Sequence, residues 1–283
     1  MKLGVTCEGG ANRTIFACGA MDALLDLGIY PDYFIGVSAG IADGVSYLSK
    51  QKGRNLRILT RFAGDKRYIS VRNWLNPRNR AVYGLKFAFE EVPNLHEPFD
   101  FETFAAFQGP CLAVVTNLET GQAEYLEVPR HDDAFTLLKA SCAMPLMFPA
   151  VTYQGQRYLD GGVADPIPFE KAMADGCEKN IVILTREPGY QKKQERLTAL
   201  VNRRYRRYPL FLDALARRPR VYNQSRVRLF ELEKAGRALV ILPDNTEGFG
   251  RLESDSDKLR ALYRHGYDKV MADRARIETY LNT

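Results

Sequence analysis

Short apolar runs alternate with segments of helical periodicity along the first 50 residues. Leu3–Cys7 and Tyr33–Val37 are apolar runs of strand length. Between them, residues 15–27 carry apolar side chains at the spacing of an amphipathic helix, and Gly28 follows as a C-cap. Residues 39–48 have the pattern of the next helix. The succession predicts a strand–helix–strand unit with parallel strands and a right-handed crossover.

The rest of the chain continues this alternation. Further strands are expected at 111–116, 123–128, 151–159, 180–185 and 239–242, with a hairpin turn at 154–156. Further helices are expected at 54–63, 101–107, 133–142, 168–175 and 194–207, with two more over about 210–235 and a long one at about 256–281. The pattern predicts a single α/β domain over residues 1–283, a three-layer α/β/α sandwich with a mixed, mostly parallel sheet.

Composition narrows the class of protein. The 283 residues are 46% hydrophobic and 26% charged, which is enough to bury a sizeable core. No apolar run approaches the roughly 20 residues that span a bilayer, and Glu8 comes too early for a signal peptide. Five cysteines without a Cys-x-x-Cys pair make a zinc site or a disulfide framework unexpected. We expect a cytoplasmic protein with no transmembrane segment, metal or cofactor.

A Gly-x-Ser-x-Gly motif lies where the second strand meets the next helix, at Gly36-Val37-Ser38-Ala39-Gly40. A serine on such a sharp strand-to-helix turn is exposed to substrate, and small neighbours let the backbone fold tightly. Amide groups at the start of the helix would stabilise a developing oxyanion. A simpler interpretation is a glycine-rich loop with an N-capping serine. The motif makes Ser38 a candidate nucleophile.

A loop of small residues follows the first strand, at Gly9-Gly10-Ala11-Asn12-Arg13. Consecutive small residues expose amide groups that can bind an anion, and the arginine adds a positive charge. Neighbouring parallel strands end at the same edge of a sheet, so this loop is expected beside the serine motif. A nucleotide phosphate loop is the other interpretation, but neither of its glycine patterns is present.

A serine hydroxyl needs a proton acceptor, and the chain has only three histidines. His96 and His131 fall in predicted loops, and His265 falls inside the C-terminal amphipathic helix. Asp160, in Asp160-Gly161-Gly162, ends the second strand of the predicted hairpin. Partial burial would raise its pKa from about 3.9 and make it a better base. An aspartate in a turn is also an ordinary structural feature.

These motifs, in this order, resemble those of the patatin-like phospholipases, and specifically a bacterial cytoplasmic branch of these lipid acyl hydrolases. The segment Lys139–Ala150 also resembles the family's stretch ahead of the aspartate, and the likeness extends over nearly the whole chain. The resemblance implies a catalytic dyad in which Ser38 attacks an acyl carbonyl and Asp160 accepts its proton. It further implies that amides around Gly10 and Ala11 hold the oxyanion, and that the substrate is a lipid or other acyl ester.

The loop departs from the family pattern at two positions. Ala11 and Thr14 stand where the family usually has glycine. A side chain at a position that needs a positive φ costs roughly 1 kcal/mol or more. These departures leave open a lipid-binding or regulatory protein with a degenerate loop. A second alternative is a Ser–Asp–His triad, because Ser38, Asp160 and His265 follow the chain order of α/β-hydrolases.

Positive charge is concentrated in one segment. Residues 191–230 contain twelve Lys or Arg and two acids, although the whole chain has a net charge of only +6. A solvated helix face packed by its aromatic side chains is one interpretation. Contact with an anionic membrane surface is another, and it would make the protein peripheral to the membrane. No nucleic-acid recognition module is evident, so a nucleic-acid partner is not expected.

Overall fold

The apolar runs form the strands of one sheet in the computed structural model, which describes residues 1–77, 79, 81–193 and 199–283. The strands are β1 (Leu3–Cys7), β2 (Tyr33–Val37), β3 (Cys111–Asn117), β4 (Ala123–Glu127), β5 (Val151–Tyr153), β6 (Gln156–Asp160), β7 (Lys179–Ile183) and β8 (Leu239–Ile241). Every residue of β1, β2 and β3 is buried, which is why these strands are continuously apolar rather than alternating.

The sheet is mixed and mostly parallel. Strands β3, β2, β1, β7 and β8 lie side by side in that order, and all four pairings are parallel. At the β3 end, β4 and β6 pair with β3 in antiparallel fashion, and β5 pairs with β6 as the predicted hairpin. The carboxyl ends of β1 and β2 therefore lie next to each other. Asp160, the last residue of β6, lies opposite Val115 of β3.

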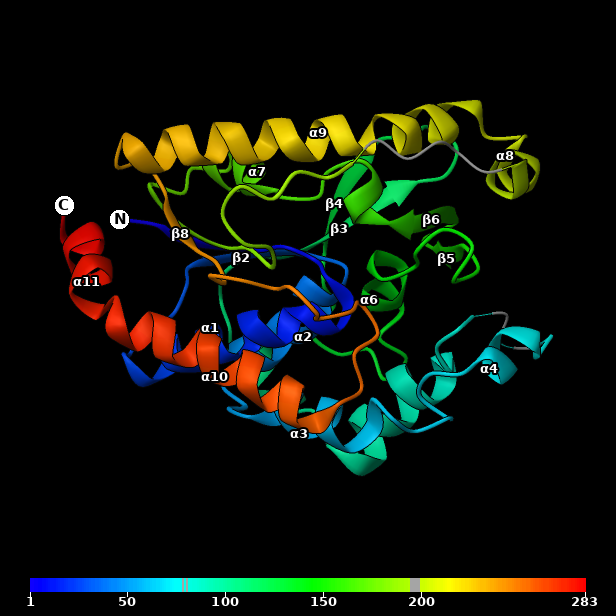
Figure 1. Ribbon diagram of the computed structural model, residues 1–283, viewed down its shortest axis with the longest axis horizontal. Coiled ribbons are helices and arrows are strands. Elements are labelled where there is room, and N and C mark those ends of the chain that lie inside the picture. The colour runs from blue at the N-terminus through cyan, green and yellow to red at the C-terminus, as the bar shows by residue number, and fades with distance from the viewer. Residues whose placement is uncertain (78, 80, 194–198) are drawn as a thin grey trace.

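Helices cover both faces of this sheet, as predicted (Figure 1). Helices α7 and α9 lie over one face, and α1, α2, α3 and α10 lie over the other. The helices are α1 (Ile15–Asp26), α2 (Ala39–Leu48), α3 (Arg54–Phe62), α4 (Val71–Leu75), α5 (Phe101–Ala105), α6 (Thr136–Ser141), α7 (Phe169–Ala174), α8 (Ala199–Tyr205), α9 (Pro209–Lys234), α10 (Ser256–Ala272) and α11 (Arg274–Asn282). Within the described part of the chain, none is long and apolar enough to cross a membrane.

The segment 210–235, expected as two helices, is the single helix α9. Pro219 lies inside it and is buried, although proline removes a hydrogen bond from a helix interior. Phe211, Tyr222 and Leu229 are each at most 2% exposed and pack against the body of the protein. This burial keeps the helix continuous where local propensity favoured a break.

The C-terminal helix is divided, contrary to the prediction of one long helix. Helix α10 ends at Ala272, Asp273 has φ −86° and ψ 7°, and α11 begins at Arg274. Helices α1 and α10 cross very closely, because a Cβ atom at Gly266 would collide with the carbonyl oxygen of Phe16. A glycine in the middle of α10 is therefore required by packing.

Within the described residues, four helical segments were not predicted: the short helix α4, a π-helix at Phe87–His96, which contains Pro93, and two 3-10 helices at Ala11–Thr14 and Gly161–Val163. Helix α8 was expected from residue 194, but 194–198 lie outside the described residues. The fold thus agrees with the α/β prediction and differs from it in the helical segments that lie beyond the sheet.

Candidate active site

Ser38 lies on the sharp turn between β2 and α2. Its backbone has φ 56° and ψ −132°, a strained conformation for a residue with a side chain. Its amide donates to Ser141 Oγ at 2.8 Å, and that hydroxyl donates to the carbonyl oxygen of Val114 at 2.7 Å. Ser141 thus supports the turn, a role that the sequence motifs did not indicate.

Asp160 lies at the end of β6, directly against this serine. The Ser38 hydroxyl donates to Asp160 Oδ2 at 2.7 Å, although the two residues are 122 positions apart. The other carboxylate oxygen, Oδ1, accepts from the Gly162 amide at 2.8 Å. Only 3% of Asp160 is exposed, and this burial raises the pKa of its carboxyl group above the ordinary value. Arg218 and the two hydrogen bonds oppose that rise in pKa.

Close backbone contacts explain the glycines of these motifs. A Cβ atom added to any of four glycines would come within 3.0 Å of a main-chain atom of another segment or of the following turn; these are Gly9, Gly36, Gly40 and Gly161. Gly162 has more room, and its carbonyl oxygen accepts from Arg218 Nε at 2.7 Å. Val37 and Ala39 flank the serine as the last residue of β2 and the first of α2. The motifs therefore meet as a tightly packed turn.

The loop after β1 reaches the same place as Ser38, as expected from the parallel pairing. The Asn12 amide donates to the carbonyl oxygen of Arg251, and the Arg13 amide donates to that of Gly10. Within the described residues, the amides of Gly9, Gly10 and Ala11 have no hydrogen-bond acceptor. These three amides are therefore the loop's candidate donors to a substrate oxygen, while those of Asn12 and Arg13 hold the loop in shape.

The two departures from the family's glycine pattern differ in conformation. Ala11 has φ 50°, in the left-handed region that favours glycine, whereas Thr14 has φ −61° and is unstrained. The Thr14 hydroxyl is 2.6 Å from the Ala11 carbonyl oxygen and 2.6 Å from Asp43 Oδ2. Burial raises the pKa of Asp43 to about 6. Thr14 thus ties the loop to α2, and only Ala11 carries the strain.

A mostly apolar cavity opens from Ser38. It contains about 990 Å³ of empty space, counted out to its mouth, and its walls come from α2, α3, the π-helix and the segment before β5. Its side chains include Val45, Ile58, Phe89, Leu138 and Phe148. We call this space the apolar cavity. Its apolar lining suits a hydrocarbon chain.

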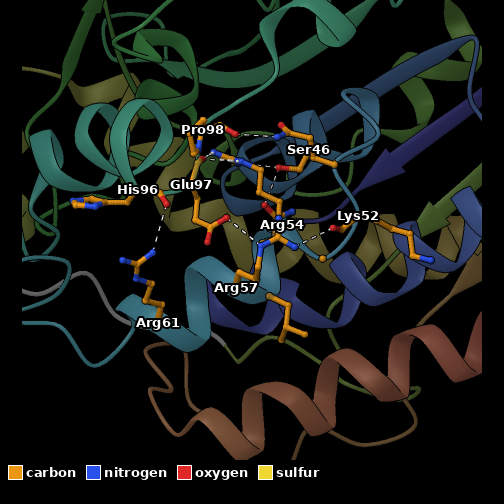
Figure 2. Close-up of polar contacts among 12 residues, drawn as sticks. Ser46, Lys52, Arg54, Arg57, Arg61, His96, Glu97 and Pro98 are labelled. Atoms are coloured by element: carbon orange, nitrogen blue, oxygen red, sulfur yellow. Dashed lines mark hydrogen bonds and ion pairs between the residues drawn. The ribbon is translucent and has the colours of Figure 1, made fainter.

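Arginines of α3 secure one wall of the apolar cavity (Figure 2). Arg54 donates to the Glu97 carbonyl oxygen through Nε and Nη2, at 3.2 and 2.9 Å, and to Ser46 Oγ at 3.0 Å. Arg57 Nε lies 3.1 Å from Glu97 Oε2. These contacts fasten the end of the π-helix to α3 and α2. The wall is therefore held by polar contacts behind an apolar surface.

A second cavity also reaches Ser38 and Asp160, and its lining is very different. Five basic side chains face it, together with Glu8, Tyr190 and Tyr222. The five are Arg13, Arg186, Lys192, Arg218 and Arg251. We call this space the basic pocket. Of these five residues, only Arg13 carries a motif that predicts it here, whereas Lys192 and Arg218 fall in the basic segment 191–230, which was expected at the surface.

The histidines lie elsewhere. His265 Nε2 is 3.0 Å from Asp244 Oδ2, and its ring packs edge-on against Phe16. It lines neither the apolar cavity nor the basic pocket. His96 packs against aromatic rings at the end of the π-helix, and His131 packs against Phe101. The carboxylate of Asp160, rather than an imidazole, is the group that bonds the Ser38 hydroxyl.

A serine on a strand-to-helix turn, bonded to a buried carboxylate beside amides that have no acceptor among the described residues, is an arrangement typical of serine acyl hydrolases. The family model described as patatin-like phospholipase matches residues 5–173, and the chain belongs to this family. A second model, described as a domain of unknown function (DUF6363), matches residues 208–282.

Two individual proteins are similar to parts of this chain. The uncharacterized protein YjjU of Escherichia coli (strain K12) is 24% identical over 188 residues, which cover 65% of this chain and 52% of that protein. The chain thus spans about half the length of this relative. The crystal structure of VipD from Legionella pneumophila superposes with a TM-score of 0.48 at 13% identity, over 96% of this chain and 66% of that one.

Proposed function

We propose that this protein hydrolyses carboxylic esters of lipids through an acyl-enzyme intermediate on Ser38, with Asp160 as the base. The observation that carries the proposal is the 2.7 Å hydrogen bond from the Ser38 hydroxyl to Asp160 Oδ2. Membership of the patatin-like phospholipase family supports the lipid acyl class. The apolar cavity that opens from Ser38 supports a fatty acyl chain as the group transferred.

In the first step, Ser38 Oγ attacks the ester carbonyl carbon and its proton passes to Asp160 Oδ2. An ordinary aspartate is a weak base at neutral pH, but burial raises the pKa of Asp160 and so improves its basicity. The C–O bond to the alcohol then breaks, and Asp160 returns the proton to the leaving oxygen. The products of this step are the acyl-serine and a free alcohol.

In the second step, Asp160 takes a proton from water, and the resulting hydroxide attacks the acyl-serine. The carboxylic acid leaves and Ser38 recovers its hydroxyl proton from Asp160. In both steps, negative charge develops on the carbonyl oxygen. The amides of Gly9, Gly10 and Ala11, which have no acceptor among the described residues, are the proposed donors to it.

Two substitutions test the dyad directly. Ser38→Ala removes the nucleophile, and Asp160→Asn keeps the shape of the base but not its proton affinity. We expect each to abolish hydrolysis of p-nitrophenyl butyrate while circular dichroism and the melting temperature show a folded protein. The matched control is His265→Ala, which we expect to retain activity. Full activity in either dyad variant would exclude this mechanism, and loss in His265→Ala alone would favour a triad.

The exposed surface of α8 and the start of α9 supports contact with an anionic membrane. Leu200 and Leu210 are 61% and 56% exposed, next to exposed arginines at 203, 204, 206 and 207. Apolar side chains among cations suit the interface of an anionic bilayer. Other cations of 191–230 turn inward, such as Arg226, which is 3% exposed and bonds the carbonyl oxygen of Glu187.

Co-sedimentation with vesicles tests this contact. We expect binding to vesicles that contain phosphatidylglycerol, with loss at high salt and in the double variant Leu200→Ser/Leu210→Ser. Binding that depends on neither anionic lipid nor salt would contradict the membrane proposal without bearing on the dyad.

A further inference from the structure

The basic pocket brings positive charges together from four separate parts of the chain. Arg13 follows β1, Arg186 and Lys192 follow β7, Arg218 is on α9, and Arg251 precedes α10. The carboxylates among the lining residues are those of Glu8 and Asp160. Among the described residues, five cations therefore face two acids in a small space beside the reacting serine.

Both acids accept hydrogen bonds from groups other than these cations, although Arg218 and Arg251 lie near enough to Asp160 to oppose the rise in its pKa. Glu8 Oε2 accepts from the Thr185 amide at 2.7 Å, and Asp160 accepts from Ser38 and Gly162. Arg186 does have a partner, because its Nη2 lies 3.1 Å from Glu187 Oε1. However, the Nε atoms of Arg13 and Arg186 are buried without an acceptor among the described residues. A buried donor of this kind requires an acceptor from elsewhere.

The positive charges also repel one another. Burial lowers the pKa of Lys192 to about 8, and the nearby Arg218 and Arg251 contribute to that decrease. Burial, Arg186 and Arg251 likewise lower the pKa of Arg13. Each shift means that the protein holds these groups charged at an energetic disadvantage. A bound anion would remove the disadvantage.

The basic side chains are held in place before any ligand arrives. The Arg186 guanidinium lies over the Tyr190 ring, 3.9 Å from its centre, and Lys192 Nζ lies 4.7 Å from the centre of the Tyr222 ring. The main chain of Lys192 is fixed by Asn223, which accepts from its amide at 2.8 Å and donates to its carbonyl oxygen at 3.0 Å. Preorganised cations of this kind favour binding because little side-chain freedom is lost.

We propose that the basic pocket binds the phosphoryl group of the ester substrate, and that it selects esters whose head group carries no cation of its own. A phosphoryl group offers several oxygen acceptors, which match the donors of arginine and lysine. Ser38 and Asp160 line the same pocket, so the phosphoryl group would lie on the leaving-alcohol side of the scissile bond. A choline or ethanolamine head group would place a cation among five others. The inference rests on the acyl hydrolase proposed above and assigns its substrate class.

Three esters with one octanoyl chain test this selection, each used below its critical micelle concentration: octanoyl-glycerol 3-phosphate, octanoylglycerol and octanoyl-lysophosphatidylcholine. We expect kcat/KM for the glycerol phosphate ester to exceed that for each of the other two about tenfold or more. Lys192→Gln and Arg251→Gln should each reduce this ratio about tenfold, the effect of losing one charge-assisted hydrogen bond. The control, Lys193→Gln, removes an exposed neighbouring charge and should leave the ratio within twofold.

Experiments with inorganic phosphate distinguish a site for the substrate's phosphoryl group from a site for a free anion. It should inhibit hydrolysis of the glycerol phosphate ester competitively. Equal kcat/KM for the phosphorylated and neutral esters, or activation of octanoylglycerol hydrolysis by inorganic phosphate, would overturn the proposal in favour of a site for a free anion. A preference for the choline ester would also overturn it.

Binding to the Ser38→Ala variant keeps this test independent of catalysis. By calorimetry, we expect octanoyl-glycerol 3-phosphate to bind this variant more tightly than octanoylglycerol, and Lys192→Gln to remove the difference. If Ser38→Ala still hydrolyses esters, the dyad fails while this measurement still decides the pocket. If both ligands bind equally, the proposal for the basic pocket is wrong, and the hydrolysis assay alone then tests the dyad.

Discussion

Of the residues that the structure describes, the apolar cavity and the basic pocket share only Ala11, Ser38 and Met144 in their linings. Every residue that lines the apolar cavity lies between Ala11 and Phe148, inside the region that matches the patatin-like phospholipase model. The basic pocket adds Arg186, Lys192 and others from beyond that region. One side of the serine is thus built by the family's own segment, and the other is completed by the C-terminal part of the chain.

This difference separates two questions about the molecule. The matched region supplies the serine, the carboxylate and the apolar cavity proposed for an acyl chain, which bear on the type of reaction. The later residues supply four of the five cations, which bear on the substrate that is chosen. Part of the basic pocket, including Arg218 and Arg251, lies in the region matched by the model of unknown function.

Asp160→Asn should have the largest effect, because Asp160 is the proposed base for every ester, whichever side selects the substrate. We expect kcat to fall about 10³-fold or more for neutral and phosphorylated esters alike. Stability should not fall at pH 7. Burial raises the folded-state pKa of Asp160, so its stabilising contribution is present at low pH and lost as the pH rises through that value. A melting temperature several degrees below wild type at pH 7 would contradict this assignment.

Ala42→Leu should affect the apolar side alone. Ala42 lines the apolar cavity from α2, and added methyl groups there would shorten the space for an acyl chain. We expect kcat/KM for p-nitrophenyl dodecanoate to fall about tenfold relative to p-nitrophenyl butyrate, since a few methylenes of lost burial are worth 1–3 kcal/mol. Ala275→Leu, on the exposed side of α11, is the matched control. An equal loss for both esters would show that the acyl chain lies elsewhere.

A change of pH should affect the basic side alone. Lys192, with its pKa lowered to about 8, is charged at pH 7 and mostly neutral at pH 9. The preference for a phosphorylated over a neutral ester should therefore weaken several-fold over that interval. Dependence on Asp160 is common to both esters and cancels in the ratio. The charged and titratable groups around Lys192 are Glu8, Arg13, Arg186, Tyr190, Arg218, Tyr222 and Arg251. A ratio that stays constant from pH 7 to pH 9 would contradict a role for the Lys192 ammonium.

Ala11→Gly should have the smallest effect, at the boundary that both cavities share. Ala11 has φ 50°, so glycine would relieve strain there. We expect the free energy of unfolding to increase by about 1 kcal/mol in urea denaturation. The control is Ala235→Gly, whose φ of −83° offers no such relief, and which should be neutral or destabilising. Destabilisation by Ala11→Gly would contradict the account that the positive φ of Ala11 strains the loop.

The sequence predicted the centre of the fold well because its signals there are local. Buried parallel strands are continuously apolar, and Gly-x-Ser-x-Gly marks the turn at Ser38. The continuity of α9 through Pro219 was not predictable in this way, since it depends on burial against the rest of the protein. The break at Asp273 has no glycine or proline to mark it.

The candidate site was likewise predictable only where a local sequence motif marks it. Ser38, Asp160 and the loop from Gly9 carry motifs, and the structure brings all three together. No motif marks the role of Ser141 or of the four later cations of the basic pocket, because these residues converge on the serine from segments far apart in the chain. Lys192 and Arg218 fall in a basic stretch that looks like a charged surface until the fold turns them toward the serine.

Covalent labelling of Ser38 tests the central claim most directly. A fluorophosphonate probe reacts only with an activated serine, and peptide mass spectrometry identifies the labelled residue. We predict one adduct, on the peptide that contains Ser38, with labelling at least 100-fold slower in Asp160→Asn and unchanged in His265→Ala. An unlabelled Ser38, or equal rates in the wild type and Asp160→Asn, would contradict the account.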